Sequence, residues 1–334
     1  MTEENSKSKI IYLEAIRIFA ILCVMFTHSG PRGSNYYQYT DSTILYIWSL
    51  SLELLSDIGV PLFLMVSGVL LLNKEEPAKV VYTNRVPRML LVLFLFSLIR
   101  YLYECFVVKT MAFSVTGFLM LLWKGELFLP FWYLYTYISI LLFLPFFRRM
   151  ARNLTVTEGN LFLLICLFWT VLMPILIALF GAPSGFAKML ETYIISMMTG
   201  YILEHVADIK WPAKCIIPFS LLVILVCIIL MMAIEPLRYM LLYPVTTGAF
   251  LIIKSIPWDR FKRLSPWLVK IGSCTFGLYL IEDYLRNLFG FVYDKTCGII
   301  TPIFANALWL FVVFCIGIVI VSLIKKIPGI KKLF

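Results

Sequence analysis

Long apolar runs separated by short polar segments cover almost the whole chain. The second run is too long for one straight span, and Ser56–Pro61 is expected to break or kink it. Residues 111–123 are apolar but short, which favours a re-entrant or interfacial helix. The pattern predicts an all-α fold, a polytopic membrane bundle of about ten transmembrane helices. Read with a window of about 19 residues, the runs fall at about 10–29, 44–72, 87–107, 131–147, 160–180, 187–204, 215–234, 239–256, 271–291 and 302–324.

Composition supports a membrane location. The chain has 334 residues, of which 61% are hydrophobic and 14% charged. A soluble domain has about 25% charged residues, so this chain carries too little charge to cover a surface that faces water. Its apolar excess is expected to contact a lipid bilayer. Because no long polar segment interrupts the runs, a single transmembrane domain is expected over residues 1–334.

The positions of the charges predict the topology. The net charge is +10, but Lys and Arg gather in alternate loops, so the excess does not indicate nucleic-acid binding. With the N-terminus inside, 20 of the 29 Lys and Arg fall in inner segments and 7 in outer segments. Lys and Arg are enriched in cytoplasmic loops. Both termini are therefore predicted to be cytoplasmic.

The first span contains three ionisable groups, which are costly in a bilayer and are functional candidates by default. Glu14 and Arg17 are three residues apart and can pair on one helix face. His28 follows Arg17 by eleven residues, which places both on one stripe roughly 16 Å apart. Arg17 is expected toward the inner side and His28 near the outer mouth. A satisfied ion pair with an interfacial histidine is the alternative interpretation.

A second candidate precedes the third span, where Arg85 and Arg88 flank Pro87. Proline is favoured at the first helical position, so a helix is expected to begin near Pro87. The two guanidinium groups would then lie beside free N–H groups at a helix N-terminus on the inner face, an arrangement that suits phosphate. Ordinary anchoring by positive charge at the inner face is the alternative.

Three further motifs have both a functional and a structural interpretation. The Ser67-Gly68 pair in the second span is also expected where helices pack closely. Trp132 and Tyr133 open the fourth span at the outer interface, where an aromatic belt is common. Glu282 lies in the outer part of the ninth span and is expected to face the bundle interior or water. Pairing with Arg286, one turn later, is its structural alternative.

The sequence contains none of the common metal or nucleotide motifs. It has two histidines, far apart, and no HExxH pair, Gly-rich phosphate loop or GxSxG elbow. The eight cysteines form no CxxC pair, and most lie within apolar runs. No metal site and no disulfide framework are expected.

Taken in order, the motifs resemble the membrane-bound acyltransferase-3 family. That family is characterised by an acidic residue and R-x10-H in the first span, F-x-x-x-S-G in the second and RxxR before the third. A W-[FY]-L segment opens its fourth span, and [SY]-[FY]-G-[IL]-Y-L-I-H lies near its end. Here the corresponding residues are Glu14, Arg17-x10-His28, Phe63 to Gly68, Arg85 to Arg88, Trp132-Tyr133-Leu134 and Thr275 to Ile281.

The resemblance implies an O-acyltransferase, most typically an O-acetyltransferase, in a cell membrane such as the bacterial plasma membrane. Acetyl-CoA or another acyl-CoA would be the cytoplasmic donor, and a lipid-linked or cell-envelope glycan the acceptor. His28 matches the catalytic histidine, acting as general base or acyl carrier. Arg17, oriented by Glu14, would line the donor channel or stabilise the tetrahedral intermediate. The resemblance also implies that Arg85, Arg88 and Ser67 contact the donor, and that Trp132, Tyr133 and Tyr279 contact the acceptor.

Two positions depart from the family pattern. Glu282 stands where the late segment usually ends in histidine, and it joins the candidate catalytic group with its role open. Leu129-Pro130-Phe131 lacks the histidine that often precedes Trp132. A separate extracytoplasmic transferase is a further expected partner, unless the chain acylates its acceptor directly.

Two rival functions follow from the same residues. A flippase or proton-coupled transporter of a lipid-linked saccharide would use Glu14, Arg17 and Glu282 as a relay. The chain shows no internal repeat, which is common in transporters. Another multispan acyltransferase superfamily uses an intramembrane histidine with an asparagine, and the motif context here differs from it.

Overall fold

A computed structural model describes residues 3–172, 192–234, 237 and 241–329, and the side chains of residues 11–172, 193–234, 237 and 241–329. Within these ranges every regular element is a helix, which confirms the all-α prediction. Contacts divide the chain into two compact units. The first comprises Met1–Leu70 and Leu154–Pro328, and the second Leu71–Asn153 with a few C-terminal residues.

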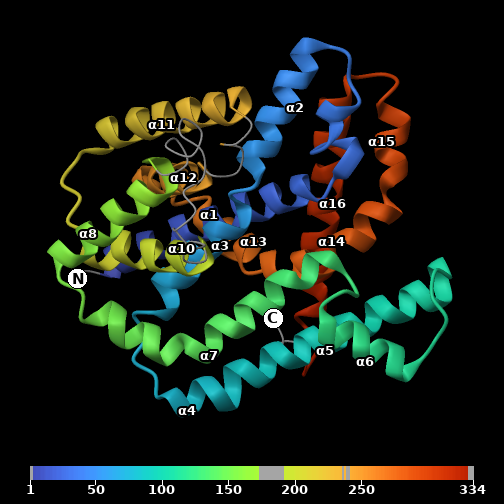
Figure 1. The fold of residues 1–334 in the computed structure, drawn as a ribbon, viewed down its shortest axis with the longest axis horizontal. Coiled ribbons are helices and arrows are strands. Elements are labelled where there is room, and N and C mark those ends of the chain that lie inside the picture. Colours follow the sequence, from blue (N-terminus) through green and yellow to red (C-terminus); the bar gives the residue numbers. More distant parts are fainter. Residues whose placement is uncertain (1–2, 173–191, 235–236, 238–240, 330–334) are drawn as a thin grey trace, which may run out of the picture. The chain divides into compact units, whose positions relative to one another are not determined.

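The first unit contains most of the helices (Figure 1). Its helices pack around a core that includes Ile16, Leu62 and Phe250, all fully buried. Helices α11 and α12 pack side by side, and α14 and α15 both pack on α16. Its elements are α1 (Glu3–Thr27), η1 (Gly30–Arg32), η2 (Tyr36–Gln38), α2 (Thr43–Ser56), α3 (Gly59–Leu71), α8 (Val156–Leu167), η6 (Phe168–Leu172), α10 (Thr192–Tyr201), η7 (Ile202–Val206), α11 (Ala213–Ala233), α12 (Leu242–Ser255), η9 (Trp258–Phe261), α13 (Ser265–Gly272), α14 (Thr275–Leu288), α15 (Gly290–Thr296) and α16 (Pro302–Ile324).

The second unit is built on α5 and α7, which pack against each other. A small core of Tyr101, Phe118 and Leu127 holds the short helix α6 against α5. Its elements are α4 (Ala78–Val80), the π-helical turn η3 (Val81–Arg85), α5 (Val86–Tyr103), the π-helical turn η4 (Glu104–Val108), α6 (Val115–Lys124), η5 (Leu129–Phe131) and α7 (Trp132–Arg152).

Five helical stretches among the described residues are long and apolar enough to cross a membrane, namely Thr43–Leu71, Ala78–Val108, Leu129–Arg152, Ala213–Ala233 and Pro302–Ile324. Each of the other five predicted runs contains a helix in its described part. The predicted runs 160–180 and 187–204 extend outside the described residues, as does the start of 239–256. Lys188 and Arg238, both counted in the outer segments, also lie outside them. The count of ten spans and the inner termini therefore stay predictions.

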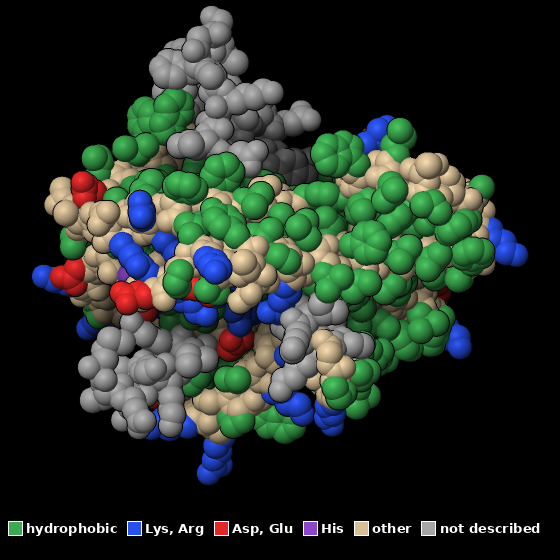
Figure 2. Space-filling model, turned by 90° about the horizontal axis from the view of Figure 1, so that it is seen from below, with side chains coloured by type: hydrophobic (Ala, Val, Ile, Leu, Met, Phe, Trp, Pro, Cys, Tyr) green, Lys and Arg blue, Asp and Glu red, His purple; other side chains and the backbone are tan. Residues whose placement is uncertain are grey.

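Helix α11 shows why lipid must surround the protein. It is apolar on all sides, and Phe219, Leu222 and Leu225 are each more than half exposed. A helix that is apolar all round is stable only when it is buried in protein or in lipid. The face in Figure 2 shows the same property, because apolar side chains cover much of it. The exposed apolar surface indicates an integral membrane protein.

The predicted break in the second run is present. Helix α2 ends at Ser56, α3 begins at Gly59, and Asp57 and Ile58 form a turn between them. Gly59 lies against α1, where an added Cβ would be 2.8 Å from the carbonyl oxygen of Ala20. Pro61, which has no N–H to donate, falls in the first turn of α3, where none is needed. The break thus positions the following segment close to α1.

The short segment at 111–123 also forms a helix, α6, which has ten residues. Ser114 caps it by accepting a hydrogen bond from the N–H of Gly117, and Gly125 ends it in the left-handed conformation. Ten residues rise about 15 Å, too short to cross a bilayer. Met120 and Trp123 are exposed on it, 63% and 89% respectively. Its length and exposed apolar face fit the interfacial interpretation.

One prediction was wrong. The helix that carries Arg85 and Arg88 begins at Ala78 and runs without interruption through the π-helical turn Val81–Arg85 into α5. The N–H of Val86 donates to the carbonyl of Val81, so no free helix N-terminus lies beside the two arginines. Proline removes one hydrogen bond of the ladder and crowds the preceding turn. The wider π-helical turn before Pro87 absorbs both effects, which sequence periodicity did not reveal.

The Ser67-Gly68 pair marks a close helix crossing within the first unit. A Cβ added to Gly68 would lie 1.8 Å from the carbonyl oxygen of Met197 on α10. Reciprocally, a Cβ at Gly200 would lie 2.2 Å from the carbonyl oxygen of Met65 on α3. The two backbones touch through their glycines, as small residues allow in membrane bundles. For Gly68, the packing interpretation is confirmed.

Candidate active site

His28 and Glu282, which are 254 residues apart in the sequence, form a direct pair in the first unit. Nδ1 of His28 lies 2.7 Å from Oε1 of Glu282. His28 directly follows the last residue of α1, and Glu282 projects from the middle of α14. The side chain of Glu282 is 1% exposed and that of His28 is 20% exposed. The carboxylate is thus buried behind the ring, and the imidazole stays accessible.

Arg286 braces this pair. Its Nε donates to Oε2 of Glu282, and its Nη1 donates to the backbone carbonyl of His28. Its Nη2 donates to Oδ1 of Asp283 at 2.9 Å. Glu282 and Arg286 are one turn apart on α14, so the helix aligns them on one face. One guanidinium group therefore fixes both the carboxylate and the backbone of the histidine.

The pair has a clear chemical consequence. A carboxylate that accepts a hydrogen bond from Nδ1–H holds the imidazole in one tautomer and orientation. In that tautomer Nε2 carries the lone pair. Among the described residues, Nε2 of His28 has no hydrogen-bond partner. His28 can accordingly take a proton from, or attack, a group that approaches its exposed side.

Glu14 and Arg17 form the ion pair that their spacing predicts. Nη1 of Arg17 lies 2.7 Å from Oε1 of Glu14. Oε2 of Glu14 is buried without a hydrogen-bond partner among the described residues. It lies against Gly272, where an added Cβ would be 2.1 Å away. The Arg17 side chain is 28% exposed, and its guanidinium has donors beyond the one that Glu14 uses. It can therefore donate to an anionic group.

Two other predicted residues of the first unit lie on α3 and α14. Ser67 is half-buried, next to the Gly68 crossing. Tyr279 is half-buried on α14, three residues before Glu282, and stacks on Phe276 with ring centroids 6.4 Å apart.

In the second unit, Arg85 is engaged by an acid that the sequence did not single out. Nε and Nη2 of Arg85 donate to the two carboxylate oxygens of Glu76 at 2.9 and 3.2 Å. The buried Arg148 donates to the same carboxylate at 2.9 Å and to the carbonyl of Leu71. Glu76 therefore pairs with two arginines, both of which are predicted to lie on the inner side.

The remaining predicted residues also belong to the second unit. Arg88 is exposed on α5. Trp132 and Tyr133 are half-buried at the start of α7, with their rings edge-on to each other at 6.3 Å. Tyr133 also stacks on Tyr137 at 5.9 Å. These contacts explain the aromatic segment as local packing and leave its role toward an acceptor a prediction.

Residues 10–326 match the model of the acyltransferase domain that defines acyltransferase-3 proteins. The chain belongs to the acyltransferase-3 family. The match covers nearly the whole chain and both compact units of this acyltransferase. No curated protein and no solved structure matches it.

In this acyltransferase-3 protein, the contacts of Glu282 explain why a glutamate occupies the position where the family pattern has a histidine. A carboxylate there can accept from His28 Nδ1–H and from Arg286 at the same time, which a neutral imidazole cannot do. Arg286 was considered only as a partner of Glu282, and its bond to the His28 carbonyl was missed. Its position one turn after Glu282 was the available signal. Within the described residues, no group of three or more His, Cys, Asp or Glu could hold a metal ion.

Glu76, Arg85 and Arg148 are called the Glu76 cluster. Its contacts predict that the stability of the protein depends on pH. Burial by itself would raise the pKa of Glu76, but hydrogen bonds from Arg85 and Arg148 outweigh burial and lower this pKa below its usual value. A lowered folded-state pKa contributes stability above the unfolded pKa, and this contribution is lost as the pH falls through the folded pKa. Glu76→Gln should lower the free energy of unfolding by about 1–3 kcal/mol at pH 7. It should also flatten the loss of thermal stability in acid.

Thermal unfolding of the purified protein in detergent, from pH 7 to pH 3, measures this effect. The matched control is Glu75→Gln, which removes a neighbouring exposed acid of the same loop. If Glu76→Gln and Glu75→Gln have the same melting temperature and pH profile as the unchanged protein, the Glu76 cluster does not contribute to stability.

Proposed function

We propose that this membrane acyltransferase transfers an acyl group, specifically acetyl, from cytoplasmic acyl-CoA to a hydroxyl of a lipid-linked or cell-envelope glycan. The observation that carries the proposal is the pair of His28 Nδ1 and Glu282 Oε1, 2.7 Å apart, in a chain of the acyltransferase-3 family. A buried carboxylate behind an accessible imidazole suits proton transfer at a hydroxyl. A bacterial plasma membrane is the proposed location.

The proposed reaction uses His28 as the general base. Nε2 takes the proton of the acceptor hydroxyl while the oxygen of that hydroxyl attacks the carbonyl carbon of the thioester. Collapse of the tetrahedral intermediate breaks the carbon–sulfur bond, and the CoA thiolate leaves with the proton that His28 holds. In the second route, Nε2 attacks the thioester carbonyl, the carbon–sulfur bond breaks and the CoA thiolate leaves. The acceptor oxygen then attacks the acyl carbon, the nitrogen–carbon bond breaks, and the hydroxyl proton passes to the CoA thiolate. Glu282 stabilises the cationic ring in both routes.

The arginines have separate proposed roles. Arg17, paired with Glu14, lines the channel through which the acyl arm of the donor reaches His28, because it lies about three helical turns before His28 on α1. Arg85 and Arg88 hold the CoA phosphates. The bias of Lys and Arg toward the inner segments supports this assignment, because it predicts a cytoplasmic position for both. Arg85 would share its guanidinium between Glu76 and the donor, since Glu76 engages two of its nitrogens.

Donor binding tests this part of the proposal. Arg85→Ala and Arg88→Ala should each raise the Kd for acetyl-CoA by about tenfold or more, because each removes a charge-assisted hydrogen bond. Isothermal titration of the purified protein in nanodiscs measures the Kd. Arg149→Ala is the matched control, since Arg149 is an exposed arginine of the same unit and predicted side.

Two outcomes would contradict the proposal. If acetyl-CoA does not bind the unchanged protein, the assignment of acyl-CoA as the donor is wrong. Loss of glycan export with unchanged glycan acylation in a His28→Ala strain would favour the flippase or transporter instead.

A further inference from the structure

The segment between α12 and α14 presents basic and apolar side chains together on the surface of the first unit. Helix α12 ends at Ser255 and α14 begins at Thr275, so the segment joins two of the predicted membrane spans. It contains η9 and α13. It is therefore expected at the bilayer surface, on the side that the bias of Lys and Arg predicts to be cytoplasmic.

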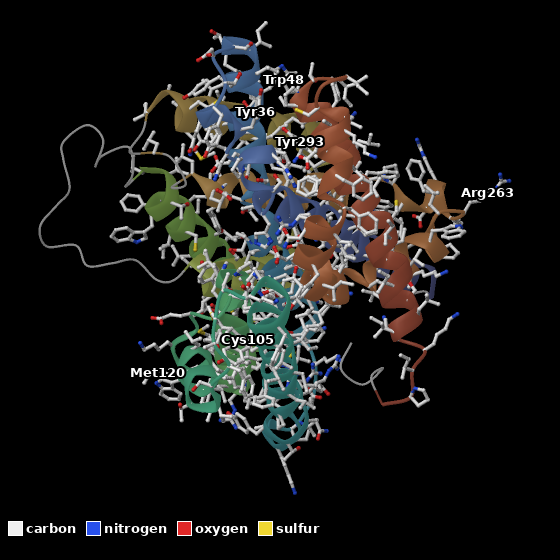
Figure 3. All side chains as sticks on the ribbon, turned by 90° about the vertical axis from the view of Figure 1, so that its right-hand side faces the viewer. Tyr36, Trp48, Cys105, Met120, Arg263 and Tyr293 are labelled. Carbon is white, nitrogen blue, oxygen red and sulfur yellow. The ribbon has the colours of Figure 1, made fainter. Side chains whose placement is uncertain are left out.

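Six exposed side chains of this segment, three basic and three apolar, are called the basic–apolar surface below. They are those of Arg260, Phe261, Arg263, Leu264, Trp267 and Lys270. Trp267 is 62% exposed, the most of the three apolar residues. Figure 3 shows the Arg263 side chain extending away from the helices of its unit. Both kinds of side chain are thus available to a partner at the same place.

The positive charge of this surface is not neutralised within the described part of the chain. Four cations against one acid give residues 258–270 a net charge of +3. Among the described residues, no carboxylate lies within ion-pair distance of Arg260, Arg263 or Lys270. Nζ of Lys270 instead lies 5.6 Å from the ring centroid of Trp267, one turn earlier on the same face of α13. The surface therefore has free positive charge to offer.

The other side of α13 is fixed, which keeps this surface directed outward. Helix α13 packs on α1, and its Gly272 lies against Glu14, where an added Cβ would be 2.1 Å from Oε2. Nζ of Lys325, directly after α16, donates to the carbonyl of Ser273 at 2.9 Å and to its Oγ at 3.2 Å. Contacts with α1 and α16 thus hold the end of α13 in place.

The mixture of side chains restricts the class of partner. A water-soluble anion such as the phosphates of CoA would satisfy the cations and leave Trp267 and its apolar neighbours in water. An uncharged lipid would cover the apolar side chains and leave the cations without counter-charge. An anionic phospholipid satisfies both, because its phosphate lies directly above its apolar chains. Basic segments at a membrane attract anionic lipids, and tryptophan favours the interface.

We propose that the basic–apolar surface binds anionic phospholipid of the cytoplasmic leaflet, with its cations at the phosphate groups and its apolar side chains in the interface below them. The proposal does not depend on the acyl-transfer reaction, because it follows from exposure, charge and the position between two spans. Since α13 also packs on Glu14, a bound lipid would hold this helix beside the Glu14–Arg17 pair.

Lipid binding to the full-length protein tests the proposal. The purified protein in detergent is titrated with phosphatidylglycerol or with phosphatidylcholine, and native mass spectrometry gives the Kd of each lipid. The triple variant Arg260→Gln, Arg263→Gln and Lys270→Gln should raise the Kd for phosphatidylglycerol about a hundredfold, because each cation at a membrane surface contributes about fivefold. Its Kd for phosphatidylcholine should not change.

Two control variants separate charge at this surface from other causes. The first removes three exposed cations of the second unit, Lys74→Gln, Lys79→Gln and Arg149→Gln, and should keep the Kd of the unchanged protein. The second, Arg260→Lys with Arg263→Lys, keeps the charge and should also keep the Kd, because either cation attracts an anionic headgroup.

Several outcomes would overturn the proposal. Equal affinity of the unchanged protein for the two lipids would mean that charge does not select the partner. An equal loss in the two triple variants would mean that the surface at α13 has no particular role. The same loss in the charge-conserving variant would mean that the arginines act through the fold. A triple variant that binds phosphatidylglycerol normally but loses acetyl-CoA would assign the surface to the donor.

Discussion

Replacing His28 with alanine is expected to lower the rate of acyl transfer by about 10²–10⁴-fold, the usual contribution of a general base. The reason is the loss of the imidazole that takes the proton of the acceptor hydroxyl in the proposed reaction. Glu282→Gln should lower kcat at least about tenfold, because the amide no longer stabilises a cationic ring. Release of CoA from acetyl-CoA, measured with a thiol reagent in the presence of host glycan, gives these rates.

His205→Ala is the matched control for the first substitution. His205 is the other histidine, and its Nε2 lies 3.1 Å from the backbone carbonyl of Val69, away from the proposed chemistry. It should retain the turnover of the unchanged protein. Normal turnover in a folded His28→Ala protein would remove His28 from its assigned role. A His28→Ala protein that loses acetyl-CoA binding would instead indicate a role for His28 in donor binding.

Gly68→Ala is expected to give the largest loss of stability from a single added carbon. The new Cβ would lie 1.8 Å from a backbone carbonyl oxygen of α10, and a backbone atom cannot move aside as a flexible side chain can. Overpacking of this kind commonly costs about 1–3 kcal/mol, and the backbone contact places Gly68 at the upper end of that range or above it. Fluorescence-detected size-exclusion chromatography and thermal unfolding measure the loss.

Gly298→Ala is the matched control, because an added Cβ there meets nothing within 4 Å. Gly200→Ala should behave like Gly68→Ala, since it meets α3 from the opposite side. If Gly68→Ala and Gly298→Ala unfold at the same temperature, α3 and α10 do not approach as closely as the structure shows.

Hydropathy predicted the helices well because burial in lipid selects long apolar segments whatever their partners are. The break at Asp57–Ile58 was also predictable, since local proline and glycine signals mark it. The helix start at Pro87 was not. Proline is compatible with both a helix start and a π-helical turn, and only the hydrogen bonds before Val86 distinguish them.

Some contacts of the candidate site could likewise be predicted from the sequence, and others could not. The Glu14–Arg17 pair was predictable from a spacing of three residues, because helical geometry alone brings such residues together. The contacts of Glu76 with Arg85 and with Arg148 were not anticipated. They depend on how a loop folds back on α7, for which the sequence carries no periodic signal.

The sequence by itself determined the all-α membrane character, the break in the second span and the set of motifs that resembles the acyltransferase-3 family. Each of these depends on residues close together in the chain or on the cost of placing charge in lipid. Only the tertiary structure brought His28 to Glu282 and placed Arg286 behind both, and only it showed that the end of α13 is held against Glu14. Contacts across 254 residues depend on how α1 and α14 pack, and one chain carries no local pattern for that packing.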